Sequence, residues 1–119
     1  MGRLSEVYET EGSCYWVVES SDGRIVGGAG VGPWSAGEGI CELQKMYFLK
    51  EARGNGIAQE LLQLILQYAK VYYKKCYIET LHNMEAANKF YRKHGFIQLE
   101  KPLSQTEHYA CDVWYIKEL

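Results

Sequence analysis

A glycine-rich turn connects a predicted strand, residues 41–49, to a long amphipathic segment. It reads Lys-Glu-Ala-Arg-Gly-Asn-Gly-Ile-Ala over residues 50–58. A strand that leads through such a turn directly into a helix presents unpaired backbone N–H groups and the positive end of the helix dipole. This arrangement is suited to a phosphate or pyrophosphate. The turn lacks the Gly-Lys-Ser/Thr of a P-loop, and the three-glycine dinucleotide fingerprint is incomplete.

Size and charge restrict the class of protein. The chain has 119 residues, which predicts one domain over 1–119, and its formal net charge of −2 gives no nucleic-acid footprint. The four cysteines are far apart, without a C-x-x-C pair, so we expect neither zinc nor a disulfide framework and favour a reducing cytoplasm. No apolar run is long enough to predict secretion or membrane spanning.

The elements that must position the turn are an alternation of strands and two helices. Residues 14–19 and 24–31 are predicted to form a hairpin, and residues 1–12 are left as a helix tail or an arm. A helix from Gly56 to about Tyr73 and a strand over 76–81 imply a right-handed parallel crossover. A second helix is predicted from Glu85, with Asn83 as its cap and Gly95 as its terminator. Residues 96–100 and 109–116 are the last predicted strands.

Two strands carry anomalies. Cys41 and Leu43 share one face under period 2, whereas Met46 and Phe48 resume one residue late. Either an extra residue around Gln44 and Lys45 forms a β-bulge that splays the strand from its neighbour, or the second half of the strand is buried on both sides. The glycines at 27, 28 and 30 indicate a bulge or bend, or else a close approach of a backbone or ligand.

These features together resemble a known family. The turn fits [Gln/Arg]-x-x-Gly-x-[Gly/Ala] through Arg53, Gly56 and Ala58, and Ala87-Asn88-x-x-Tyr91-x-x-x-Gly95-Phe96 follows in order. The chain is similar from about Tyr15 onward to the GCN5-related N-acetyltransferase (GNAT) superfamily. The resemblance implies an α/β GNAT fold, with a mixed, mostly antiparallel sheet, a splayed parallel strand pair and flanking helices. Its N-terminal strand and helices would be shortened or absent.

The resemblance also implies a binding track for acetyl-CoA, used as acetyl donor without a metal. The turn would hold the pyrophosphate, the third strand would pair with the pantetheine arm, and an amide of Tyr47 or a neighbour would polarise the thioester carbonyl. Tyr91 would be the general acid that protonates the leaving thiolate, or only a core aromatic. The implied cofactor-binding residues are Met46, Tyr47, Phe48, Arg53, Gly54, Asn55, Gly56, Ile57, Ala58 and Asn88, the last of which could instead be a solvated helix residue.

The reaction requires a base, because a primary amine with a pKa near ~10.4 is protonated at neutral pH. Glu42 is the leading candidate, since it matches the place of the glutamate base in the histone-acetylating branch, although it could be a solvated strand residue. Glu79 is the second candidate. Cys41 and Cys111 are better interpreted as buried thiols than as nucleophiles.

The front of the chain departs from the family pattern. Members usually begin with a strand and two helices that form a wall of the acceptor site, whereas only about a dozen residues precede the first clear strand here. Trp34 and Tyr109 could line the acceptor site or pack in the core, and His108 could lie near the acceptor or on the surface.

The resulting prediction is direct transfer of an acetyl group to an amine of a small molecule or peptide, with no nucleic-acid or membrane partner. An inactive CoA-binding or regulatory module and an ATP- or NAD-binding domain are the alternatives. The exposed last strand makes a homodimer possible.

Overall fold

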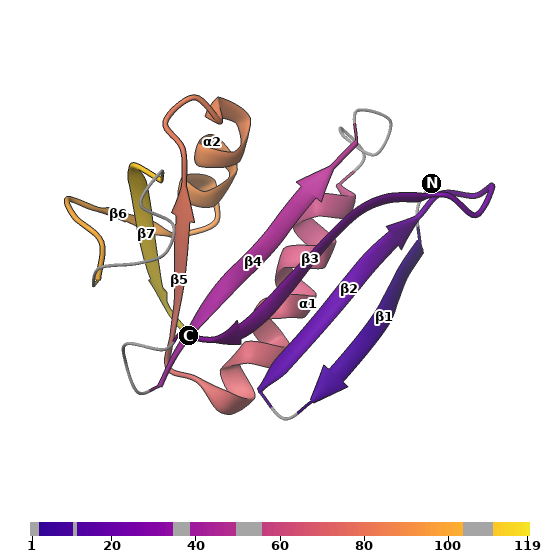
Figure 1. The fold of residues 1–119 in the computed structure, drawn as a ribbon, viewed down its shortest axis with the longest axis horizontal. Helices are drawn as coiled ribbons and strands as arrows, with labels where there is room; N and C mark the ends of the chain where they lie inside the picture. Colours follow the sequence, from indigo (N-terminus) through magenta and orange to yellow (C-terminus); the bar gives the residue numbers. More distant parts are fainter. Residues whose placement is uncertain (1–2, 11, 35–38, 50–55, 104–110) are drawn as a thin grey trace.

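Seven strands form one sheet, and two helices pack beside it (Figure 1). This computed structural model describes residues 3–10, 12–34, 39–49, 56–103 and 111–119. The sheet order is β1-β2-β3-β4-β5-β7-β6, and every neighbouring pair is antiparallel except β4 with β5. The strands and helices are β1 (Arg3–Thr10), β2 (Ser13–Glu19), β3 (Ile25–Pro33), β4 (Ile40–Phe48), α1 (Ile57–Tyr72), β5 (Lys75–Thr80), α2 (Glu85–Lys93), β6 (Ile97–Leu99) and β7 (Val113–Glu118). The mixed, mostly antiparallel sheet predicted from the sequence is confirmed.

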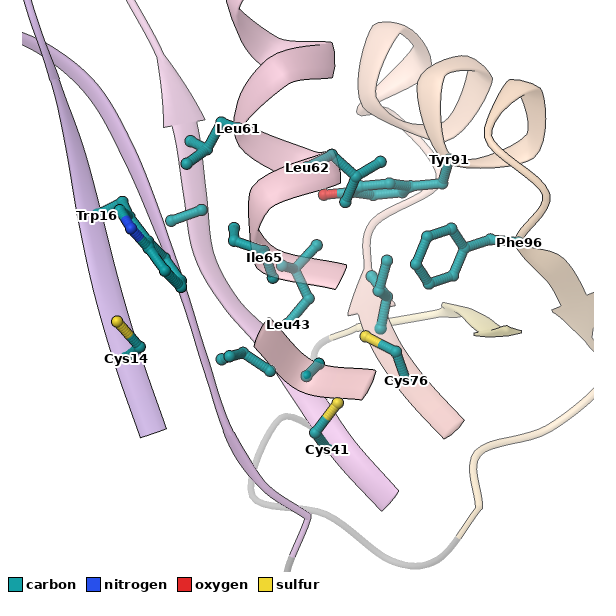
Figure 2. Close-up of a cluster of buried hydrophobic side chains, with 14 of the residues drawn as sticks. Cys14, Trp16, Cys41, Leu43, Leu61, Leu62, Ile65, Cys76, Tyr91 and Phe96 are labelled. Carbon is teal, nitrogen blue, oxygen red and sulfur yellow. The ribbon is translucent and has the colours of Figure 1, made fainter. Parts of the chain in front are cut away.

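The main core lies between the sheet and α1 (Figure 2). Alternate residues of β2 face this core, because successive side chains of a strand point to opposite faces. The buried residues of α1 recur on one face at helical spacing, and each large aliphatic side chain removed from water contributes about 1.5–3 kcal/mol. They are Ile57, Leu61, Leu62, Ile65 and Ala69. Two hydrogen bonds link the C-terminal end of α1 to the start of β2. The Tyr68 hydroxyl donates to the Ser13 carbonyl at 3.1 Å, and the hydroxyl of Tyr73, which follows α1, donates to the Gly12 carbonyl at 2.7 Å.

The phase slip in β4 is a β-bulge. Gly30 of β3 pairs with Gln44, and Gly28 pairs with Tyr47, so two residues of β4 oppose one residue of β3. Cys41 and Leu43 are buried before the bulge, and after it Met46 and Phe48 pack against the same core. The alternative of a second half buried on both sides is wrong, because 44% of Tyr47 is exposed. The bulge therefore keeps the apolar side chains on one face at the cost of a local kink.

β4 and β5 are joined by a short seam. They share three registered pairs, Ile40 with Lys75, Cys41 with Cys76 and Glu42 with Tyr77. Beyond the seam the two strands diverge, as Figure 1 shows, toward the region where α1 begins and α2 lies. The splayed parallel pair expected from the sequence is confirmed.

The glycines of β3 allow a close approach from β2. A Cβ on Gly30 would lie 2.6 Å from Tyr15 Cδ2 and 3.0 Å from the Cys14 carbonyl oxygen, and one on Gly28 would lie 2.9 Å from the Tyr15 hydroxyl. The ring of Tyr15 thus occupies the space over both glycines. Both interpretations offered by the sequence apply here, since the register of β3 with β4 also shifts between Gly28 and Gly30.

We expect Gly30→Ala to destabilise the fold by about 1–3 kcal/mol, because the methyl group would overlap a ring and a backbone oxygen. Urea unfolding measures the loss. Gly32→Ala is the matched control on the same strand, since its Cβ would meet no atom closer than 3.4 Å. Equal stability of the two variants would contradict this account.

The sequence predicts the C-terminal end of α2 correctly but not its N-terminal end. Gly95 has φ +88°, and the N–H groups of Gly95 and Phe96 donate to the carbonyls of Arg92 and Tyr91, so the predicted glycine terminator is confirmed. The prediction of Asn83 as the cap is wrong. The Met84 N–H donates to the Leu81 carbonyl, which closes a turn just before the helix. Met84 therefore occupies the N-cap, one residue after Asn83, and its side chain makes no capping hydrogen bond.

Two further expectations are corrected by the topology. Residues 3–10 form β1, antiparallel to β2, rather than a helix tail or an arm. The last strand begins at Val113 instead of Tyr109 and lies between β5 and β6, so it is not an exposed edge; residues 104–110, including His108 and Tyr109, lie outside the described residues. In the part of the chain described, no helix is long and apolar enough to cross a membrane.

Candidate active site

The start of α1 presents backbone groups at the open end of the splay. Gly56 occupies the N-cap with φ +80° and ψ 0°, and no side chain caps the first turn. Its carbonyl accepts the first helical hydrogen bond, from the Glu60 N–H at 3.1 Å. The left-handed backbone at Gly56 favours glycine, and a Cβ there would meet none of the described residues within 4 Å. Ile57 is buried and Ala58 half-buried, whereas Arg53, Gly54 and Asn55 lie outside the described residues.

The second half of β4 forms one side of the splay. Met46 and Phe48 point toward the core, and Tyr47 points to the other face. Within the described strands the registered pairing of β4 with β5 ends at Glu42, whereas Tyr47 and Phe48 still pair with β3 and Met46 lies in the bulge. A strand with one unpaired side can accept an extended ligand as an added strand.

Tyr91 of α2 lies on the α1 side of the sheet. Its ring is buried and meets Phe96 and Tyr115 edge-on, with ring centroids 5.9 and 5.8 Å apart. Its oxygen points toward α1 (Figure 2). Burial raises the pKa of Tyr91 to about 12, so the phenol keeps its proton throughout the physiological range. Among the described residues, its hydroxyl makes no hydrogen bond.

Asn88 is held inside the protein. Its side-chain Nδ2 donates to the Leu81 carbonyl at 2.9 Å, and its Oδ1 accepts from the Tyr115 hydroxyl at 3.1 Å. Only 5% of the residue is exposed, so the alternative of a solvated helix residue is wrong. The sequence analysis did not find Tyr115, because its partner lies 27 residues away and no local pattern connects them.

The opposite face of the sheet carries the carboxylates. Glu42 accepts a hydrogen bond from Gln44 Nε2 at 3.3 Å and pairs in register with Tyr77. The Tyr77 hydroxyl donates to Glu79 Oε2 at 2.9 Å and accepts from the Leu103 N–H at 3.3 Å. Burial raises the pKa of Tyr77 well above its ordinary value, so this phenol stays protonated.

Two buried polar atoms on this face make no hydrogen bond with any residue that the structure describes. They are the indole Nε1 of Trp34 and the Oε1 of Glu79. Trp34 packs on Tyr77, with ring centroids 4.7 Å apart, and Tyr77 in turn bonds Glu79, so both atoms belong to one cluster. Trp34 therefore takes part in this small second core, one of the two possibilities stated for it.

The candidate acid and bases are separated by the sheet. Cys41 and Leu43 join the α1-side core, so Glu42 between them projects to the other face, whereas Tyr91 lies on the α1 side. The structure thus places these residues on either side of the splay without contact. The thiol of Cys41 is buried, and burial raises the pKa of the half-exposed Cys111, so neither thiol is suited to nucleophilic attack. The described residues contain no group of three or more side chains that could hold a metal ion.

Sequence comparison defines the class. Residues 11–98 match the acetyltransferase (GNAT) domain family. The chain is also 40% identical over 121 residues to YjgM of Escherichia coli K12, which is named an uncharacterized N-acetyltransferase, and the match covers the whole chain and 72% of that relative. The chain belongs to the GNAT family of acetyltransferases.

Solved structures share its fold. A GNAT-family acetyltransferase from Staphylococcus aureus Mu50 superposes with a TM-score of 0.80 at 22% identity, covering 91% of this chain and 69% of that one. A GNAT-family acetyltransferase from Elizabethkingia anophelis with acetyl-CoA bound superposes with a TM-score of 0.69 at 20% identity, covering 91% and 77%. The predicted GNAT fold is confirmed.

Proposed function

We propose that this protein transfers the acetyl group of acetyl-CoA to an amine of a small molecule or peptide by direct attack in a ternary complex. The observation that carries the proposal is the seam of three residue pairs between β4 and β5, followed by a bulge and a splay that opens toward the start of α1. In a GNAT-family chain, this arrangement is suited to an extended cofactor.

The described residues have the properties that acetyl-CoA would require. A pyrophosphate fits the uncapped first turn of α1, where Gly56, Ile57 and Ala58 contribute backbone rather than charge. A pantetheine arm fits along Met46, Tyr47 and Phe48, beyond the point where the registered pairing of β4 with β5 ends. When bound, the thioester supplies the activated acyl group. A backbone amide beside the bulge would donate to its carbonyl oxygen as negative charge develops there.

The proposed proton transfers use the two faces of the sheet. Glu42, on the face opposite α1, removes a proton from the incoming ammonium group directly or through water. Attack on the carbonyl carbon then forms the amide bond as the carbon–sulfur bond breaks, and the nitrogen loses a second proton to water, from which Tyr91 is reprotonated. Tyr91, on the α1 side, donates a hydrogen bond and then its proton to the departing sulfur.

The unpartnered atoms of the Trp34 cluster support an acceptor on the same face as Glu42. Buried polar groups are usually hydrogen-bonded, and an exception commonly marks a site for a ligand or water. Glu79 Oε1 can accept from an N–H or O–H group, and the Trp34 indole can donate to an oxygen. An acceptor that carries both kinds of group therefore fits better than a simple alkylamine.

The proposal is tested with purified protein, acetyl-CoA and a panel of amines, with release of free thiol as the readout. Turnover that depends on the amine and yields the acetylated product supports it. Binding of CoA without turnover on any amine would favour the alternative, an inactive CoA-binding module. Absence of CoA binding would overturn both readings, and affinity for ATP or NAD instead would indicate a different nucleotide-binding function.

We expect Gly56→Ala to weaken acetyl-CoA binding by roughly tenfold or more, because a methyl group at φ +80° strains the turn and covers the helix start. Isothermal titration calorimetry measures this affinity. Gly23→Ala is the matched control: Gly23 has φ +86° and equally open surroundings, but lies in the turn between β2 and β3. Equal loss of affinity in both variants would attribute the effect to general strain.

A further inference from the structure

We propose that Tyr115 of β7 is a positioning residue that fixes where Tyr91 presents its hydroxyl. The inference rests on the proposed function, in which Tyr91 is the acid. Tyr115 contacts Tyr91 and Asn88 and is not itself one of the residues proposed to bind acetyl-CoA, so it would act through its neighbours on α2.

Tyr115 contacts three residues on one face of α2. Its hydroxyl donates to Asn88 Oδ1 at 3.1 Å and accepts from Arg92 Nη1 at 3.1 Å. Its ring meets the Tyr91 ring at an interplanar angle of 61°. Residues 88, 91 and 92 follow i, i+3 and i+4 spacing, which places them on one side of a helix. Tyr115 itself is fully buried.

The contacts continue beyond α2. Asn88 Nδ2 donates to the carbonyl of Leu81, which directly follows β5. A single network therefore joins β7, α2 and the end of β5. Rotation of α2 about its axis would break hydrogen bonds of groups that are buried, and such groups find no water to replace the lost partner.

Tyr91 needs such external positioning. Its hydroxyl makes no hydrogen bond among the described residues, so the direction of the phenol is set by packing and by the orientation of α2. Its ring contacts are Phe90, Phe96 and Tyr115. A small displacement of a reacting group is enough to reduce catalysis strongly, so the Tyr115 hydroxyl should affect the rate although it would not touch the substrate.

The test uses Tyr115→Phe, which keeps the ring and removes the two hydrogen bonds to α2. We expect kcat to fall roughly tenfold while the KM for acetyl-CoA changes less than about threefold. In a Tyr91→Phe background, the same substitution should change kcat less than about twofold, because the group being positioned is gone. Tyr73→Phe is the matched control; it removes a hydroxyl that bonds the Gly12 carbonyl at 2.7 Å, remote from α2, and should leave kcat unchanged.

Equal losses of kcat in both backgrounds would indicate a general structural effect and overturn the inference, as would an unchanged kcat in Tyr115→Phe. If the wild-type protein acetylates no amine, the proposed function fails separately, and the inference is then judged by NMR of ¹³C-labelled tyrosine. A changed Tyr91 ring signal in Tyr115→Phe, with an unchanged signal in Tyr73→Phe, supports it. An unmoved Tyr91 signal overturns it.

Discussion

Tyr91→Phe is expected to lower kcat by about 10²-fold or more, the usual contribution of a positioned general acid. The substitution removes only the hydroxyl of this side chain, which bonds no described residue. Stability should therefore change by less than about 0.5 kcal/mol. Thiol release gives kcat, and urea unfolding gives the stability. A loss of kcat below about threefold in a stably folded variant would contradict the assignment of Tyr91 as the acid.

The raised pKa of Tyr91 defines how this acid would work. Because burial raises that pKa to about 12, the neutral phenol is retained as pH rises and lost only near pH 12. A thiol has a pKa near ~8.5, so the thiolate is a weaker base than the Tyr91 phenolate. Full transfer of the Tyr91 proton to the thiolate is therefore unfavourable. Tyr91 contributes first through a hydrogen bond to the sulfur, which strengthens as negative charge develops there. Tyr91 should therefore cause no alkaline fall in kcat between pH 7 and pH 10.

Glu42→Gln is expected to lower kcat/KM for the amine by roughly 10–10²-fold at pH 7, because the amide cannot take the ammonium proton. The deficit should shrink as pH approaches the amine pKa of ~10.4, where free amine is abundant without a base. A pH profile of the initial rate measures this trend.

Glu79→Gln is the matched comparison for Glu42→Gln. Its carboxylate lies on the same face but is held by the Tyr77 hydroxyl at 2.9 Å. We expect Glu79→Gln to raise the KM of the amine while leaving the pH dependence of kcat/KM unchanged. If instead the loss of kcat/KM that shrinks as pH rises appears in Glu79→Gln and not in Glu42→Gln, the base is Glu79.

The parts of the fold that depend on local periodicity could be predicted. The bulge in β4 was recognisable because a buried face imposes period 2, and the shift from Leu43 to Met46 interrupts it. Gly95 was recognisable because a left-handed helix terminator favours glycine. β1 was missed because its register with β2 shifts between Glu6 and Tyr8, which breaks the alternation that identifies a strand.

The parts of the site that depend on distant partners could not be predicted. Asn88 has a place in the family motif, but the sequence does not reveal that Leu81 and Tyr115 already engage its carboxamide. Its direct contact with pantetheine remains a prediction, and its observed contacts are those of a residue that holds α2. Likewise, the sequence does not reveal that Trp34 and Glu79 each have a buried polar atom that bonds no described residue. Both side chains contact Tyr77, and these contacts exist only in the folded chain.

The short seam between β4 and β5 has a consequence for cooperativity. It divides the sheet into two blocks, β1–β4 and β5–β7–β6, which are joined through three residue pairs, through α1 and through the Trp34–Tyr77 contact. Each block has its own antiparallel pairing, so the blocks can move relative to one another without disturbing that pairing. A ligand paired along β4 would connect the blocks, and part of its binding free energy would then appear as folding free energy. The cofactor would therefore stabilise the fold as well as take part in the reaction.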